Sequence, residues 1–204
     1  MSETYIQAPA DGAGKKLRAI QKTVSANTVL SECVIRDSKR AVLGAYSVVT
    51  PEITTTAVTN YRIASIFNPN GSGKTIVIKR IIVSNRCNAA SAVNIIKLTF
   101  LSADVTGTDI SSSIAKKDSG FPASIAVVKH TAAQTGTLGN DVAAYAKVGT
   151  ASGSAELICD YYYANASVEG QEVILNPNQG FVVQKLLAGD VDDRFTVVIE
   201  WEEY

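Results

Sequence analysis

Residues 68–75 read Asn-Pro-Asn-Gly-Ser-Gly-Lys-Thr, and residues 76–83 continue as Ile-Val-Ile-Lys-Arg-Ile-Ile-Val. The first stretch is one substitution short of a phosphate-binding P-loop, Gly-x-x-x-x-Gly-Lys-[Ser/Thr], because asparagine replaces the first glycine. A P-loop also opens into a helix whose N-terminus holds the phosphate. The β-branched residues of 76–83 favour a strand instead. We therefore predict that Gly73, Lys74 and Thr75 lie in a turn between two strands and form only a decoy of a nucleotide site.

A second stretch repeats this turn chemistry. Residues 176–180 read Asn-Pro-Asn-Gln-Gly and are followed by the apolar run 181–187. This copy has no Gly-Lys-Thr and could not bind phosphate in the same way. Both copies suit turns, because proline presets φ and both asparagine and glycine accept positive φ. The repeat favours two matching turns over a nucleotide site.

Short apolar runs separated by turn residues continue along the chain, without long helical periodicity. This spacing is typical of a sandwich or barrel. In the last run, Phe195, Val197, Ile199 and Trp201 alternate with residues that would face the other way, as on a half-buried strand. We predict an all-β fold, an antiparallel, jelly-roll-like β-sandwich. Its strands are expected near residues 41–49, 62–67, 75–84, 92–101, 156–163, 172–175, 181–187 and 194–202. Two further strands are expected within residues 15–36, joined near 25–27, and a weak strand is expected at 125–129.

The 204 residues are enough for one large all-β domain with a substantial core. Residues 1–16 are mostly polar and include Pro-Ala-Asp-Gly-Ala-Gly, so we predict an extended, flexible arm there and a single sandwich over 17–204. Residues 104–150 are rich in Ser, Thr, Ala and Gly, which predicts a long, loop-rich insert. Within it, residues 140–149 fit a short helix and, nearly as well, a strand.

Charge and hydropathy argue against several classes of function. Lys+Arg and Asp+Glu both total 19, so the formal net charge is zero, whereas direct nucleic-acid binding normally needs a basic surface. The basic cluster of Lys15, Lys16 and Arg18 is too small for that purpose and is an interface candidate. There is no apolar run of about eighteen residues and no secretory pattern. We expect synthesis in the host cytoplasm and no membrane partner.

Patterns for catalysis and metal binding are sparse. His130 is the only histidine and no Gly-x-Ser-x-Gly elbow occurs, so we predict a solvated or loop histidine and no catalytic residues. The three cysteines are too widely spaced for a zinc site, and we expect no cofactor and no metal. Residues 190–193 lack EF-hand spacing. A solvated acidic turn is expected there, and a weak Ca²⁺ site between subunits stays open.

Tyr161, Tyr162 and Tyr163 form a run of aromatic residues near a predicted strand end. On a strand, the first and third share one face and the second takes the other. Stacking on carbohydrate is one interpretation. Packing at the core edge or at a subunit interface is favoured, because tyrosine suits surfaces that are apolar at one end and wet at the other. Trp201 is a further interface candidate.

Three stretches resemble small β-sandwich structural proteins of tailed-bacteriophage particles. They are the Phe-Asn-Pro-Asn-Gly-Ser-Gly-Lys-Thr turn with its strand, the Asn-Pro-Asn-Gln-Gly-Phe stretch, and the closing Phe-Thr-Val-Val-Ile-Glu-Trp-Glu-Glu run. The resemblance covers residues 60–101 and 156–204. It implies a homo-oligomeric virion component without catalytic residues, whose partners are the major capsid protein or other virion proteins.

Within the particle, capsid decoration or cement is the first expectation, and a head–tail connector, collar or tail protein is the alternative. Two alternatives from other classes remain: a nucleotide-binding enzyme built on Gly73, Lys74 and Thr75, and a carbohydrate-binding module.

Overall fold

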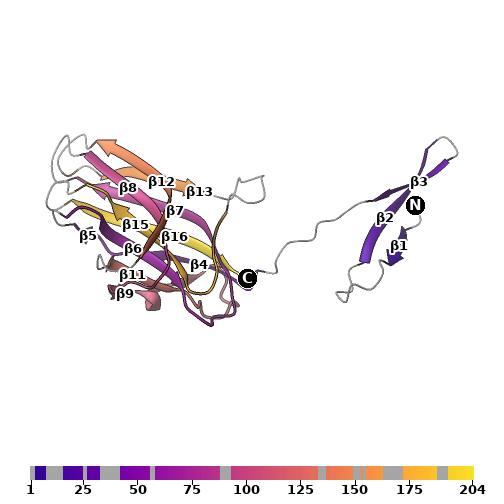
Figure 1. Ribbon diagram of the computed structural model, residues 1–204, viewed down its shortest axis with the longest axis horizontal. Helices are drawn as coiled ribbons and strands as arrows, with labels where there is room; N and C mark the ends of the chain where they lie inside the picture. Colours follow the sequence, from indigo (N-terminus) through magenta and orange to yellow (C-terminus); the bar gives the residue numbers. More distant parts are fainter. Residues whose placement is uncertain are drawn as a thin grey trace. The chain divides into compact units, whose positions relative to one another are not determined.

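The computed structural model describes residues 3–7, 16–24, 27–32, 42–55, 58–87, 93–132, 137–148, 153, 155–162, 172–187 and 193–204. The chain divides into two compact units, Met1–Arg40 and Ala41–Tyr204. The first unit contains an antiparallel meander of three strands, β1 (Glu3–Gln7), β2 (Lys16–Val24) and β3 (Asn27–Glu32) (Figure 1). Strand β1 lies within the stretch expected to be an arm. The domain boundary expected between residues 16 and 17 stays a prediction.

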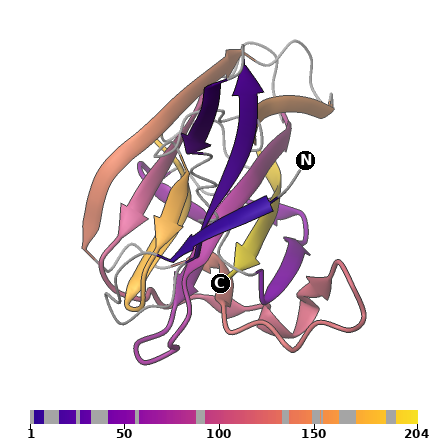
Figure 2. The ribbon, with the colours of Figure 1, turned by 90° about the vertical axis from the view of Figure 1, so that its right-hand side faces the viewer.

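The second unit consists of two antiparallel sheets packed face to face (Figure 2). One sheet has the order β10-β4-β16-β7-β13, with β5 beside β16 and β14 beside β7. Its strands are β4 (Gly44–Val49), β5 (Ile53–Thr54), β7 (Ile76–Arg86), β10 (Ala115–Lys116), β13 (Ala155–Tyr162), β14 (Val173–Leu175) and β16 (Arg194–Glu203). The other sheet has the order β12-β8-β15-β6-β11-β9. Its strands are β6 (Tyr61–Asn68), β8 (Val93–Leu101), β9 (Thr108–Asp109), β11 (Val127–Ala132), β12 (Leu138–Val148) and β15 (Gln179–Lys185).

Eight of these strands have the connectivity of a jelly roll. Strands β4, β16, β7 and β13 are neighbours in one sheet, and β6, β15, β8 and β12 are neighbours in the other. Each sheet therefore mixes strands from the beginning and the end of the unit, which is the double Greek-key arrangement of jelly rolls. The predicted jelly-roll-like antiparallel sandwich is confirmed.

The core lies between the sheets and follows the alternation of the strands. Along β16, Phe195, Val197, Ile199 and Trp201 are all buried, as the sequence predicted. Each residue that points inward on a pleated strand is followed by one that points outward, so this strand buries one complete face. The largest fully buried side chain is Trp201, whose ring lies 5.8 Å from that of Tyr46.

The insert (residues 104–150) is rich in loops in its first half, as predicted, and its second half consists mainly of two longer strands. It contains β9, a 3₁₀ turn at Ser111–Ser113, β10, β11 and β12. Strand β12 pairs with β8 over most of its length, so the helix considered for residues 140–149 is absent and the strand alternative holds. Strand β11 overlaps the weak strand expected at residues 125–129, whereas β12 was only one of two alternatives because it is rich in alanine and buries little apolar surface.

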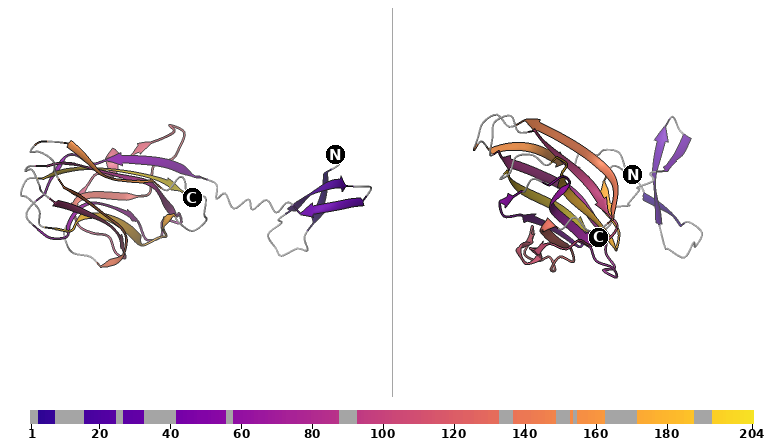
Figure 3. Two further views of the ribbon diagram at one scale, coloured as in Figure 1. Left: turned by 90° about the horizontal axis from the view of Figure 1, so that it is seen from above. Right: turned by 60° about the vertical axis from the view of Figure 1, so that its left-hand side comes forward.

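The two sides of the sandwich are closed in different ways. On one side, the insert pairs β9 with β11 and β10 with β4, and thereby bridges the two sheets (Figure 3). On the other side, the rings of Tyr145 and Tyr161 pack with 6.2 Å between centroids, and Lys147 Nζ donates to Leu157 O at 3.1 Å. These contacts join β12 to β13, which are the last strands of their sheets on this side.

Candidate functional site

One end of the sandwich brings the two Asn-Pro-Asn turns together, and we name it the turn end. The first turn joins β6 to β7 and the second joins β14 to β15, so each crosses from one sheet to the other. The backbone N–H of Asn178 donates to Asn68 O at 2.8 Å. Asn178, Gly71 and Gly73 have φ of 66°, 74° and 66°, which asparagine and glycine accept. The near-P-loop is therefore a turn between strands, as predicted.

Asn68, the residue that departs from the P-loop pattern, organises this turn. Its side chain is buried, and Nδ2 donates to Lys74 O and to Leu175 O, both at 2.9 Å. Its Oδ1 accepts from Ser72 Oγ at 2.7 Å. One amide thus closes the first turn and ties it to the strand that precedes the second. A glycine at this position could make none of these bonds.

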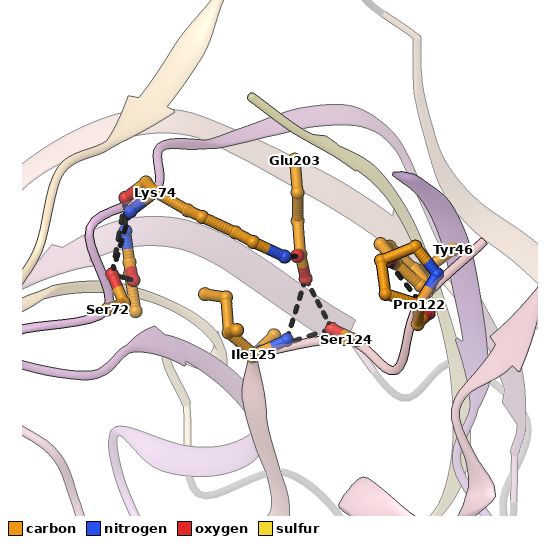
Figure 4. A network of polar contacts seen from close by, with 9 residues as sticks. Tyr46, Ser72, Lys74, Pro122, Ser124, Ile125 and Glu203 are labelled. Atoms are coloured by element: carbon orange, nitrogen blue, oxygen red, sulfur yellow. Dashed lines mark hydrogen bonds and ion pairs between the residues drawn. The ribbon is translucent and has the colours of Figure 1, made fainter. Parts of the chain in front are cut away.

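Lys74 is ion-paired within the chain. Its Nζ lies 2.9 Å from Glu203 Oε2, and the Glu203 side chain is fully buried (Figure 4). The other carboxylate oxygen accepts from Ser124 Oγ at 2.6 Å and from Ile125 N at 2.9 Å. A buried carboxylate needs such partners to offset its lost hydration. Lys74 thus helps to join the turn, the insert and the last strand.

The backbone after Lys74 is also engaged. Thr75 N–H donates to Tyr204 O at 3.0 Å, and Tyr204 N–H donates to Thr75 O at 2.9 Å. Strand β7 begins at the next residue, where a P-loop would have a helix. A P-loop directs this ammonium group and this amide to phosphate. In this structure, both groups instead form bonds with the C-terminal strand.

A groove of about 560 Å³ lies beside the second turn. Its walls come from the end of β8, the beginning of β12 and the turn before β15. The lining residues are Phe100, Leu101, Ser102, Gly139, Asn140, Pro177, Asn178 and Gln179. None of them is ionisable, and several carry amide or hydroxyl groups. Sequence reasoning missed this groove because its three segments are far apart in the chain and none has a recognisable motif.

The tyrosines of the run have different surroundings, because successive residues of a strand point to opposite faces. Tyr161 packs against Tyr145 on the β12 and β13 side of the sandwich, and burial raises the pKa of its phenol. Tyr162 is 54% exposed, with the Arg80 guanidinium 5.6 Å from its ring centroid. Arg80 also binds Asp160 in a bidentate ion pair with bonds of 2.8 and 2.7 Å. Tyr163 lies outside the described residues, and of the two described tyrosines Tyr162 is the exposed one.

His130 lies on β11 rather than in a loop, and it is partly buried. Its Nδ1 is 2.9 Å from Thr131 Oγ1, and burial lowers the pKa of its imidazole. Within the described part of the chain, no hydrogen bond or ion pair joins it to an acid or a thiol. Over the described ranges of the chain, no group of three or more His, Cys, Asp or Glu side chains could hold a metal ion.

The acidic turn is only partly described, since residues 190–192 lie outside the described ranges. Asp193 is fully buried and not solvated as expected, and its Oδ2 lies 3.7 Å from Nζ of the equally buried Lys185. Thr55 Oγ1 accepts from Lys185 Nζ at 3.2 Å and donates to Asp193 O at 3.1 Å. This cluster fastens the start of β16 to the segment after β5. The possibility of a Ca²⁺ site in this turn stays untested.

Several other interface candidates have different surroundings. Trp201 is 1% exposed, so it belongs to the core and cannot be an interface residue of the folded unit. Lys16 and Arg18 lie on β2, and Lys15 precedes this strand outside the described residues.

Two acidic residues of β16 form ion pairs with different lysines. Glu200 pairs with Lys117 at 3.2 Å, and Glu202 pairs with Lys79 at 3.1 Å. The acidic residues of β16 are therefore separate ion pairs.

No protein-family model, curated protein or solved structure matches this chain. Among the described residues, no helix is long and apolar enough to cross a membrane.

Proposed function

We propose that this chain is a non-enzymatic structural protein of a tailed-phage particle that decorates and stabilises the capsid as an oligomer. The supporting observation is its construction: a jelly roll (Ala41–Tyr204) joined to a separate unit (Met1–Arg40) with a three-stranded sheet of its own. Jelly rolls recur in viral capsids, and also in lectins and cupins. Fold alone does not decide among these classes, so the remaining argument concerns surfaces.

The N-terminal unit is small for independent stability. Its strands have 5, 9 and 6 residues. Units of about 40 residues bury too little apolar surface to fold alone without disulfides, metals or association. Association with a capsid protein or with copies of the same unit would supply the missing burial. This fits an anchor that completes its structure on the particle.

The jelly roll suits docking in a crowded lattice. The chain has zero formal net charge, and so lacks the long-range repulsion that keeps many soluble proteins apart. Its outward charges are paired locally, for example Arg80 with Asp160 at 2.7 Å and Lys79 with Glu172 at 2.8 Å. Strands β12 and β13 end their sheets on one side, so neighbours could meet these edge strands as well as the ends and faces of the sandwich. A connector, collar or tail position would use the same surfaces.

The test uses particles purified by density gradient from the organism that carries the gene. We expect mass spectrometry to find the full-length chain in the particle fraction in many copies. Particles stripped of it, or assembled without it, should bind the purified protein and then resist heat better. Absence from every particle fraction, together with no binding to such particles, would overturn the proposal.

The decoration role and the connector role imply different copy numbers of the chain in each particle. Electron microscopy of the same particles should show the chain repeated over the shell in the first case and at one vertex in the second. Either location keeps the structural class, and only the first keeps the decoration role.

A further inference from the structure

We propose that the groove at the turn end is a binding site for neutral carbohydrate. Its volume of about 560 Å³ lies within the roughly 300–1,000 Å³ usual for small-ligand sites. Most of its lining residues are exposed at the surface, including Ser102, Asn140, Pro177, Asn178 and Gln179. A ligand could therefore reach the groove without a change in fold.

The polar groups of the groove match hydroxyl groups. Asn140, Asn178 and Gln179 each carry a carboxamide, which has two N–H donors and a carbonyl acceptor, and Ser102 adds a hydroxyl. A sugar hydroxyl likewise both donates and accepts. The adjacent acid, Asp141, accepts from Thr99 Oγ1 at 2.7 Å and pairs with Lys97 on the outer face of β8 and β12. Among the described residues that line the groove, no side chain is charged, so the groove favours a neutral ligand over a phosphate, a carboxylate or an amine.

The groove also has apolar surface. Phe100 is half-buried, and its ring packs edge-on against Phe181 with 5.5 Å between centroids. Pro177, a second apolar lining residue, is exposed. Pyranose rings have a C–H face as well as a rim of hydroxyls, and binding sites combine apolar walls with a few fixed polar groups. Phe100 and Pro177 supply the accessible apolar part here.

The polar groups are held before any ligand arrives. Gln179 Oε1 accepts from Asn176 N at 2.9 Å, which leaves the Gln179 amide N–H groups to meet a ligand. The backbone of Asn178 is fixed, because its N–H donates to Asn68 O at 2.8 Å. The hydroxyl of Ser102 donates to Thr137 O at 3.2 Å, which leaves its oxygen to accept from a ligand. Fixed groups lose little entropy on binding, which favours affinity.

The test measures binding of full-length protein to neutral oligosaccharides by calorimetry and ligand-observed NMR. The probes are maltohexaose, cellohexaose, mannohexaose and galactotetraose, with sialyllactose as the charged comparison. We expect saturable binding of at least one neutral probe and none of sialyllactose.

Two variants remove groove chemistry without removing the turn. Gln179→Glu keeps an acceptor for Asn176 N–H but replaces the amide donor by a carboxylate. Asn178→Gly keeps a residue that accepts φ of 66° but deletes the amide. Each should weaken binding about tenfold or more. Unchanged melting temperature and circular dichroism would show that the variants fold.

Tyr162→Ala is the matched control, because this exposed aromatic residue lies on β13 away from the groove lining. It should bind as the unchanged protein does. The proposal would be overturned by absence of binding up to about 10 mM of every neutral probe, by preference for sialyllactose, or by loss of binding in Tyr162→Ala alone. The inference does not rest on the virion assignment, since the site would act in the same way in any jelly roll.

Discussion

Lys74 and Glu203 are 129 positions apart in the sequence, and their side chains form an ion pair of 2.9 Å at the turn end. The pair joins the segment before β7 to the end of β16, and the insert completes it through Ser124 and Ile125. Three segments that are distant in the chain thus meet at one buried carboxylate.

Replacing Lys74 by methionine should destabilise the protein by about 3 kcal/mol. Methionine keeps much of the side-chain volume but leaves the buried Glu203 carboxylate without its cation. Urea denaturation should show a lower midpoint with an unchanged slope.

The control is a double-mutant cycle with Glu203→Gln, which keeps an acceptor oxygen for Ser124 and Ile125. In the double variant the amide at position 203 faces methionine rather than an ammonium group. The free energies of unfolding lost by the two single variants should therefore add up to clearly more than the free energy lost by the double variant. Additivity within about 0.5 kcal/mol would show that the two side chains are not coupled.

Asn68→Gly completes the P-loop pattern and provides a second prediction. The glycine removes three hydrogen bonds, and the free energy of unfolding should fall by about 2–4 kcal/mol. The variant should nevertheless show no saturable binding of ATP with Mg²⁺ in calorimetry, because a strand still follows Thr75. Micromolar binding by the unchanged protein, abolished in Lys74→Ala, would support the nucleotide-binding alternative instead.

Asp193→Ala should be among the most damaging single changes, because it leaves the buried Lys185 ammonium without its carboxylate. We expect a loss of about 3–5 kcal/mol in thermal or chemical unfolding. Glu52→Gln is the comparison, because Glu52 and Arg86 form a pair 3.1 Å apart whose side chains are 43% and 44% exposed. It should cost at most about 1 kcal/mol. Similar losses in both variants would contradict the structure at Lys185.

The stability of the protein should fall at alkaline pH. Burial raises the pKa of the Cys159 thiol from 9.0 to about 11 and that of the Tyr145 phenol from 10.0 to about 12. At pH values below the unfolded-state pKa values, both groups are neutral in the folded and in the unfolded protein, and their contribution to stability is fully present. As pH rises from 9 toward 12, the unfolded chain ionises first, so stability is lost.

Urea midpoints measured between about pH 8 and 11 check this prediction. Tyr145→Phe keeps the ring that packs against Tyr161 but removes the hydroxyl, so its stability should decline less steeply over this interval. An identical slope in the two proteins would show that Tyr145 does not contribute.

The amino-acid sequence predicts best those strands that are rich in β-branched residues or that alternate clearly between apolar and polar residues. Strands β6, β7 and β16 lie within a few residues of their expected positions, and the buried residues of β16 alternate as predicted. Local patterning suffices for such strands because one whole face of each packs into the core. The two turns were also predictable, since asparagine, proline and glycine specify backbone angles locally.

The remaining features depend on pairing between distant segments, which one sequence does not display. Strand β12 is rich in alanine and packs at an edge, so its residues resemble those of a loop. Asp193 follows two other acidic positions in a turn and appeared solvated, although the fold buries it against Lys185. The bonds of Lys74 likewise depend on β16 ending beside β7.

The pairing of β4 with β16 has a mechanical consequence. Gly44 faces Glu203 in antiparallel register, so the beginning of β4 and the end of β16 lie at the same end of the sheet. Pulling Gly44 and Glu203 apart would unzip this pair one bond at a time. Tension between Gly44 and the opposite end of the sandwich would instead act along β4. All hydrogen bonds between β4 and β16 would then carry the force at the same time. A molecule held through the segment before Gly44 and strained at its far end would therefore resist force by shear.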